Sequence, residues 1–283
     1  MRSEAGVARG LRAGRVAVHA ALIFYTLLAV SPILLILVNS FKSRNAIFGE
    51  PLSLPTPETF SLIGYTSDLA KSNFSLYFAN SLIVTVSSLA LTLILGAMAS
   101  WALTEYRFRF NTWLGLYMAI GIMVPIRLGT VSILKMMVTL NLVNTRTALV
   151  LVYTAMSLPL AIFILSEFIQ QIPREMRDAA RIDGASEYSI FWRIIFPLIR
   201  PAVATVAVFT MVPIWNDLWF PLILAPGAAT QTVTLGVQQF IGQYVTDWNA
   251  VIAALSLALA PILVLYIIFS RSLVRGITAG AVK

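Results

Sequence analysis

Long apolar stretches alternate with short polar segments along the whole chain. A helix that crosses a hydrocarbon core about 30 Å thick needs about 20 mostly apolar residues. The stretches that approach this length are roughly residues 16–40, 80–103, one that begins near Trp113, 147–166, 198–223 and 250–270. The pattern therefore predicts an all-α integral membrane protein with about six transmembrane helices.

The third stretch is interrupted by charge. Only about 14 residues separate Trp113 from Arg127, and a charged side chain in mid-membrane is unfavourable unless it faces water or protein. We therefore expect residues 126–140 to bend into a short interfacial helix, followed by a turn over residues 141–145. A second interpretation places Arg127 on an aqueous pathway.

The composition agrees with a membrane protein. Apolar residues make up 59% of the chain and charged residues only 11%, whereas soluble domains carry about 25% charged residues. The net charge of +8 is spread between the apolar stretches, which argues against a nucleic-acid partner. With no cysteine and one histidine, His19, the chain has no thiol chemistry and no evident all-protein zinc site.

The distribution of Lys and Arg predicts the orientation of the chain. With the N-terminus inside, the inner segments hold 14 of these residues and the outer segments hold 6, together the 20 Lys and Arg residues of the chain. Because inner segments carry the excess of positive charge, both termini are predicted to be cytoplasmic. The predicted order is an N-terminal tail (1–15), a first helix (16–40), an outer loop (41–79), a core with five helices (80–271) and a C-terminal tail (272–283).

The first apolar stretch is too long for the apolar part of a signal peptide, which spans about 7 to 15 residues. No small-residue cleavage site follows it. We therefore interpret residues 16–40 as an uncleaved transmembrane helix.

Residues 167–200 form the longest inner connection and the most charged stretch of the chain. A helix is predicted over residues 174–182, because Pro173 suits a first helical position and good helix formers follow it. Gly184 breaks this pattern, and Ser186 can cap a second short helix. Such a unit could dock in a partner's groove or on its own bundle, or it could rest on lipid headgroups with its arginines paired to anionic lipid.

The same segment carries a family resemblance. It reads Asp178-Ala179-Ala180-Arg181-Ile182-Asp183-Gly184, then nine residues, then Ile194-Ile195-Phe196-Pro197. This spacing resembles the Glu-Ala-Ala loop of permease subunits of bacterial ATP-binding-cassette (ABC) importers. Asp178 replaces the glutamate of the family pattern and Phe196 the leucine, and both changes keep the character of the side chain.

Three further segments resemble the carbohydrate branch of these importers, in particular the smaller maltose permease. They are Asn80-Ser81, Trp215-Asn216-Asp217 and the C-terminal run from Gly276 to Lys283. The resemblance implies the type I importer permease fold with a cytoplasmic coupling helix, in the inner membrane of a bacterium. It also implies a sugar-importer subunit that works with a second permease, two cytoplasmic ATPases and an extracytoplasmic sugar-binding protein.

By the same resemblance, the Glu-Ala-Ala loop docks on a cytoplasmic ATPase and couples ATP hydrolysis to transport. The residues carried over to this role are Asp178, Ala179, Ala180, Gly184, Ile194 and Pro197. Arg181 and Asp183 are expected to form an ion pair. No lysine of the chain belongs to a Gly-x-x-x-x-Gly-Lys phosphate loop, so ATP and Mg²⁺ are expected on the partner ATPase chains.

Candidate residues for a sugar pathway are Asn80, Thr210, Asn216 and Asp217. Asn216 and Asp217 stand beside tryptophans, and aromatic stacking next to hydrogen-bonding groups is a usual way to hold a sugar. The alternative is that these tryptophans belong to the interfacial belt and that the small polar residues join helices to one another.

The outer loops, residues 41–73 and 225–249, are expected to face the sugar-binding protein. The substrate could be an oligosaccharide, a monosaccharide, or a polyol or phosphate ester. A stand-alone secondary transporter and a membrane enzyme are the other classes considered. Asp217 is the one acidic residue within the proposed spans, and no catalytic set is evident, so both classes are disfavoured.

Overall fold

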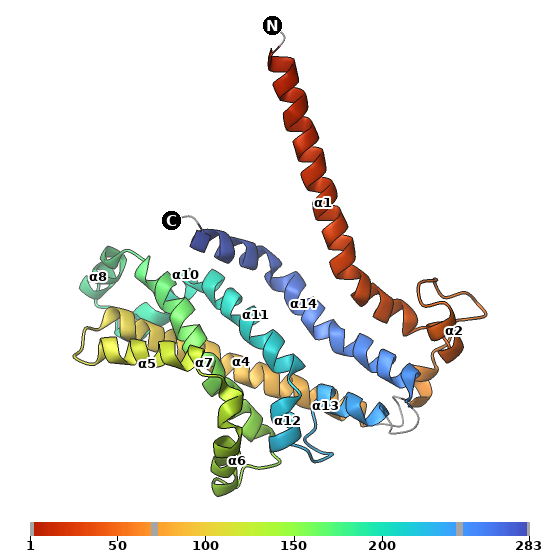
Figure 1. Ribbon diagram of the computed structural model, residues 1–283. Coiled ribbons are helices and arrows are strands. Elements are labelled where there is room, and N and C mark those ends of the chain that lie inside the picture. The colour runs from red at the N-terminus through yellow and green to blue at the C-terminus, as the bar shows by residue number, and fades with distance from the viewer. Residues whose placement is uncertain (1–2, 69–72, 242–245, 282–283) are drawn as a thin grey trace. The chain divides into compact units, whose positions relative to one another are not determined.

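The computed structural model describes residues 3–68, 73–241 and 246–281 (Figure 1). Within these ranges all regular secondary structure is helical, and strand-like pairing is confined to two isolated bridges, Lys42 with Phe60 and Ile241 with Thr246. The chain divides into two compact units. The smaller unit comprises residues 1–72 and 240–257, and the larger unit comprises residues 73–239 and 258–283.

The smaller unit contains α1 (Ser3–Asn39), α2 (Arg44–Gly49), the short π-helix η1 (Gly64–Asp68) and the first part of α14 (Trp248–Ala281). The segment after α1, which the sequence suggested to be a loop, is folded around Lys42. This side chain is fully buried, and its ammonium donates hydrogen bonds to the carbonyl of Glu50 at 2.8 Å and to Oγ of Ser53 at 3.3 Å. The Asn249 side chain donates to the Lys42 carbonyl and ties the start of α14 to this segment.

The larger unit is built on two long helices, α4 (Phe74–Glu105) and α7 (Arg146–Gln170), which pack extensively against each other. Gly96 allows a close approach, because a Cβ atom there would lie 2.9 Å from the Cβ of Ala161. The Ser100 hydroxyl donates to the Ile162 carbonyl across the same interface at 3.1 Å. Small and hydroxyl side chains are typical of helix contacts in membranes.

The third predicted span is bent. Helix α5 (Asn111–Met123) is followed by the 3-10 helix η2 (Ile126–Gly129) and by α6 (Thr130–Thr139), and the two directions differ by 89°. Pro125 lies at the break, where it has no backbone NH with which to continue a helix. The structure confirms the predicted bend and the short helix that follows it.

Helix α11 (Arg200–Asn216) packs against both α4 and α7. The sequence predicted a continuous span over residues 198–223, and this prediction is wrong at its C-terminal end. Helix α11 ends at Asn216, Asp217 is extended, and a separate helix, α12 (Trp219–Leu224), follows. The physical reason is the Asp217 carboxylate, which accepts hydrogen bonds from backbone amides of α12 and so starts a new helix.

The elbow (residues 174–198) contains α8 (Arg174–Ile182), α9 (Glu187–Ile190), the π-helix η3 (Phe191–Ile195) and α10 (Phe196–Leu198). As predicted, Gly184 turns the chain between α8 and α9. Its φ of 80° is a conformation that favours glycine. Ser186 caps α9 by accepting the amide NH of Ser189 at 3.3 Å. Pro197 lies in the first turn of α10, and the chain then bends by 73° into α11.

Helices long and apolar enough to cross a membrane cover Gly14–Asn39, Phe74–Glu105, Arg146–Gln170 and Trp248–Ile268. Two bent pairs, α5 with α6 and residues 187–198 with α11, pass this test of length and apolarity only when the two parts of each pair are counted together. Within the described ranges this gives 4 to 6 spans, in agreement with the all-α membrane fold expected from the sequence.

Candidate functional site

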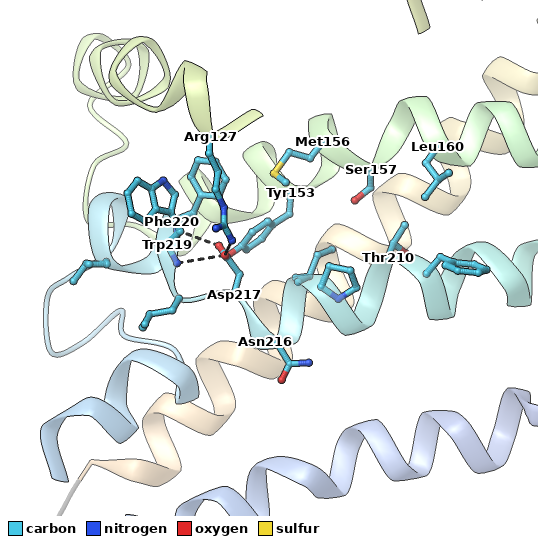
Figure 2. Close-up of a pocket in the computed structure, with 15 residues that line it drawn as sticks. Arg127, Tyr153, Met156, Ser157, Leu160, Thr210, Asn216, Asp217, Trp219 and Phe220 are labelled. Atoms are coloured by element: carbon cyan, nitrogen blue, oxygen red, sulfur yellow. Dashed lines mark hydrogen bonds and ion pairs between the residues drawn. The ribbon is translucent and has the colours of Figure 1, made fainter. Parts of the chain in front are cut away.

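A cavity of about 710 Å³ lies beside the break between α11 and α12, within the larger unit (Figure 2). Its apolar wall includes Met156, Leu160 and Phe209. Its polar residues lie partly at the break (Arg127, Asn216 and Asp217) and partly along α7 and α11 (Ser157 and Thr210). Small-molecule sites have volumes of about 300 to 1,000 Å³ and combine apolar walls with a few placed polar groups. The cavity therefore has the size and character of a small-molecule site.

Asp217 joins the helices around this cavity. Its Oδ2 accepts a hydrogen bond from the Tyr153 hydroxyl at 2.8 Å and another from the Phe220 amide at 3.0 Å. Its Oδ1 accepts from the Trp219 amide at 3.3 Å, and the side chain is only 12% exposed. The carboxylate thus caps α12 and fixes it to α7 through Tyr153.

Arg127 approaches the same carboxylate from η2 (Figure 2). Its Nη2 lies 3.9 Å from Oδ1 of Asp217, and its guanidinium lies 5.9 Å from the centre of the Trp219 ring. The Arg127 side chain is 69% exposed, so this ion pair contributes about 1 kcal/mol or less. The guanidinium donates no hydrogen bond to any residue that the structure describes, and its NH groups are available to a ligand.

Three of the predicted pathway residues, Thr210, Asn216 and Asp217, line this cavity. Thr210 is buried, and its hydroxyl donates to the Val206 carbonyl of the same helix at 2.8 Å. Asn216 is exposed, and its amide donates to the Val212 carbonyl at 2.9 Å. Figure 2 shows the Asn216 side chain pointing away from Arg127, Tyr153 and Asp217, and the Thr210 hydroxyl is occupied within α11, so neither presents a free polar group to the polar end of the cavity.

Asn80, the fourth predicted pathway residue, does not line the cavity. It is fully buried in α4, and its NH₂ group donates to the carbonyls of Ala229 and Gln231 at 2.9 and 3.0 Å. Its carbonyl oxygen accepts from Arg146 at 3.4 Å. The two bonds that Asn80 donates hold the loop that precedes α13 (Val233–Val237) against α4, and the bond from Arg146 joins α4 to the start of α7.

A second polar cluster lies where the elbow meets the end of α4. Glu105, the last residue of α4, accepts a hydrogen bond from Nη1 of Arg177 at 2.6 Å and another from Nη2 of Arg181. The side chains of Arg177 and Glu105 are 4% and 11% exposed, and the Arg177 guanidinium lies 5.6 Å from the centre of the Trp101 ring. Hydrogen bonds between charged groups are strong, and here both partners are shielded from water.

Arg181 joins the two helices of the elbow. Its Nε lies 2.8 Å from Oε1 of Glu187, and its Nη1 lies 3.1 Å from Oδ1 of Asp178. The hydrogen bond from Arg181 lowers the pKa of Glu187, and the bonds to Glu187 and Glu105 raise the pKa of Arg181. The predicted pairing of Arg181 with Asp183 is wrong, because three other carboxylates lie within reach of the guanidinium.

The predicted coupling residues divide between two faces of the elbow. Asp178 and Ala179 are exposed on α8, and Ile182 beside them is 86% exposed. Ala180 and Ile194 instead pack against a buried apolar cluster formed by α4, α7 and the elbow. One face of α8 is therefore fixed to the chain, and the other is free to meet a partner.

Comparison with known proteins identifies the family. Residues 92–279 match the family described as binding-protein-dependent transport system inner membrane component. The chain belongs to this family. This permease is 35% identical over 260 residues to a putative ABC transporter permease protein, ORF2, of Caldicellulosiruptor sp., across 92% of this chain and 94% of that protein.

Two further relatives of the permease have names that state a transported material. The diacetylchitobiose uptake system permease protein NgcG of Streptomyces coelicolor is 32% identical over 267 residues, across 94% of this chain and 88% of its own. The probable starch degradation products transport system permease protein AmyC of Thermoanaerobacterium thermosulfurigenes is 33% identical over 261 residues, across 92% and 94%.

Solved structures show that the permease has the type I ABC importer fold. A chain of a bacterial ABC transporter for import of the acidic polysaccharide alginate matches with a TM-score of 0.79 and 21% identity, over 93% of this chain and 97% of that one. A chain of the MetNI methionine ABC transporter matches with a TM-score of 0.57 and 14% identity, over 75% and 99%. The fold expected from the sequence is confirmed.

Membership of the family settles several sequence predictions. The permease is an inner-membrane component of a transport system that depends on a binding protein, and it is a transport subunit rather than an enzyme. Sequence reasoning missed Tyr153 and Glu105. Tyr153 lies 64 residues from Asp217 and carries no local signal, whereas Glu105 could have been noticed as an acid at the end of an apolar stretch.

Proposed function

We propose that this permease is a transmembrane subunit of an ATP-driven sugar importer. It forms the translocation pathway with a second permease subunit and is driven by two cytoplasmic ATPase subunits. The observation that carries the proposal is the cavity of about 710 Å³ at the break of α11, where an apolar wall meets a small group of polar side chains.

A saccharide suits the polar end of this cavity. The Arg127 guanidinium can hydrogen-bond to sugar hydroxyls, and the Trp219 ring provides an apolar face of the kind that amphipathic ligands contact. Relatives named for diacetylchitobiose, starch degradation products and arabinooligosaccharides support a saccharide as the substrate class.

The pathway residues act in different ways in this proposal. Arg127 contacts the sugar directly, Asp217 holds the helix break that shapes the cavity, and Asn216 lines the pathway at the end of α11. Thr210 fills the wall, since its hydroxyl is already bonded within α11. Asn80 acts on the pathway at a distance, through the loop that it holds before α13.

The elbow couples this pathway to ATP hydrolysis. The exposed residues Asp178, Ala179 and Ile182 dock in a groove of an ATPase subunit, and Gly184 sets the angle between α8 and α9. Ala180, Ile194 and Pro197 hold the elbow on its own bundle, as their partial burial indicates. ATP and Mg²⁺ bind on the ATPase chains. Within the described part of the permease, no group of His, Asp or Glu side chains could hold a metal ion.

The proposed orientation places the elbow and both termini in the cytoplasm. The tails are residues 1–15 and 272–283, and the inner connection is residues 167–200. The segments after α1 and before α14, roughly residues 41–73 and 225–249, then face the extracytoplasmic binding protein. The excess of Lys and Arg on the inner segments supports this orientation.

Purification and transport assays test the proposal. A tagged permease expressed with the proteins encoded beside it should co-purify with a second permease and two ATPase subunits. In proteoliposomes, this complex should take up a saccharide only when ATP and the binding protein are both supplied. Uphill transport by the permease alone, or protease mapping that places the elbow outside the cell, would contradict the proposal.

A further inference from the structure

Glu105 connects the elbow to a helix that is remote from it in the sequence. Glu105 and Arg177 are 72 residues apart. The covalent neighbours of the elbow are α7 and α11, so the elbow reaches α4 through side-chain contacts alone. Each oxygen of the Glu105 carboxylate accepts a hydrogen bond from a different arginine of α8. A single carboxylate therefore fixes two positions that lie one turn apart on α8.

The contact with Arg177 is buried. The Arg177 side chain is 4% exposed, and it lies between the Glu105 carboxylate and the ring of Trp101, which precedes Glu105 by one turn of α4. Its Nη2 also donates to the Ile172 carbonyl at 3.4 Å. A buried guanidinium that loses its carboxylate is strongly unfavourable, so Arg177 is held firmly to Glu105.

The second half of the elbow is fixed to the same end of α4. Glu187, in α9, accepts a hydrogen bond from the Tyr106 hydroxyl at 2.9 Å and also pairs with Arg181. Tyr106 directly follows Glu105. Both helices that flank Gly184 are therefore bonded to adjacent residues at the end of α4, and the angle of the elbow is held at both of its sides.

The other end of α4 reaches a different part of the permease. There Asn80 holds the loop before α13, and the Ser81 hydroxyl accepts the Val233 amide at 2.8 Å. Between these ends α4 packs against α7 and α11, whose residues wall the cavity. Helix α4 is thus in contact with the elbow, with the cavity helices and with the α13 loop.

We propose that Glu105 is a positioning residue that locks the elbow to α4, so that α4 moves together with α8 when an ATPase displaces the elbow. This inference rests on the proposed coupling function. Loss of the Glu105 charge leaves the exposed face of α8 intact, so the ATPase still binds, but its movement no longer reaches the pathway in full.

Reconstituted complexes that carry Glu105→Gln test this inference. The variant keeps the size of the side chain and removes the charge. We expect the ATPase subunits to co-purify as before and ATP hydrolysis to continue, while the amount of solute transported per ATP hydrolysed falls about tenfold, within the range typical of coupling between two sites. Glu105→Asp, which restores the charge, should recover most of this ratio.

Arg107→Gln is the matched control, because it also changes the charge by one, two residues further along. Arg107 is exposed and forms no ion pair with any described residue, and its variant should transport like the wild type. An unchanged transport-to-ATP ratio in Glu105→Gln overturns the inference. Failure of the proposed function would look different, since the wild-type complex itself would then lack ATP-driven uptake.

A distance measurement keeps the inference testable if Glu105→Gln assembles poorly. The chain has no cysteine, so spin labels can be placed at Leu95→Cys in α4 and Ile182→Cys in α8, both of which are exposed. The distribution of distances between the labels should be narrow in the otherwise native full-length chain and broad in Glu105→Gln. Equal widths in the two proteins would overturn the inference.

Discussion

The Tyr153 hydroxyl donates a hydrogen bond of 2.8 Å to Oδ2 of Asp217, and through it α7 is joined to the break between α11 and α12. Tyr153→Phe removes this bond and keeps the ring, which packs edge-on against Phe220. We expect the free energy of unfolding to fall by about 1 kcal/mol, measured as a lower apparent Tm. Tyr117→Phe is the control, because Tyr117 is 68% exposed, and an equal loss in both variants would contradict the role given to Tyr153.

Arg127 should affect transport more than stability. Its side chain is 69% exposed and its ion pair with Asp217 is long, at 3.9 Å. Arg127→Ala should leave the apparent Tm nearly unchanged, because such pairs contribute about 1 kcal/mol or less. The solute concentration for half-maximal uptake should rise about tenfold, as expected when a charged hydrogen-bond donor is lost. Lys135→Ala, also on the α6 side, should change neither quantity, and a comparable effect there would argue against ligand contact by Arg127.

At Gly184 the effect of the backbone conformation can be tested separately from the effect of side-chain size. At a φ of 80° a residue with a Cβ is strained by about 1 to 2 kcal/mol, but asparagine tolerates this region better than alanine. No atom of this chain lies within 4 Å of a Cβ placed at Gly184. Gly184→Ala should therefore reduce ATP-coupled uptake more than Gly184→Asn does. The opposite order would show that a partner surface, rather than the backbone, restricts this position.

Gly96 should tolerate no larger residue. A Cβ there would lie 2.9 Å from the Cβ of Ala161, at the contact between α4 and α7. Gly96→Val should lower the free energy of unfolding by about 1 to 3 kcal/mol, the usual effect of overpacking, which a drop in apparent Tm would report. Gly115→Ala is the control, since no atom lies within 4 Å of a Cβ at Gly115. A harmless Gly96→Val would mean that the two helices pack less closely than described.

The pairing of Arg181 with Glu187 predicts a pH dependence of the elbow. Arg181 lowers the pKa of Glu187, so the stabilisation is complete above the ordinary glutamate pKa of about 4.3 and is lost as the pH falls through the lower value of the folded protein. A spin label at position 182 should keep its mobility from pH 8 to pH 5 and become more mobile in stronger acid. Glu187→Gln removes the carboxylate that titrates, so the part of the acid-induced rise in label mobility that comes from Glu187 should be missing in this variant.

Most of the architecture could be predicted from the sequence, because the lipid requires long apolar helices and permits few alternatives. The bend before Arg127 was also predictable, since a proline and a charge interrupt one apolar stretch. The end of α11 was not. Asp217 lies in an apolar context that resembles the interior of a span, although its cap on α12 uses the nearby Trp219 and Phe220 amides, and the bond that Tyr153 adds from 64 residues away has no local signal.

The elbow shows the same limit. Its helices, its glycine turn and its serine cap follow from local rules, and each was predicted at its position. The partner of Arg181 was not predicted, because sequence proximity favoured Asp183 whereas the fold brings Glu105 within reach across 76 residues. Long-range ion pairs are decided by packing, and the sequence alone does not state which helix ends meet.

The polar residues around the cavity at the α11 break differ in how strongly the fold depends on them. Asp217 is committed to three donors of its own chain, so replacing it means rebuilding the junction. Arg127, in contrast, is exposed, and its long ion pair with Asp217 contributes little to the stability of the fold. An exchange at Arg127 can therefore change which solutes the permease carries, while the helix break held by Asp217 stays the same.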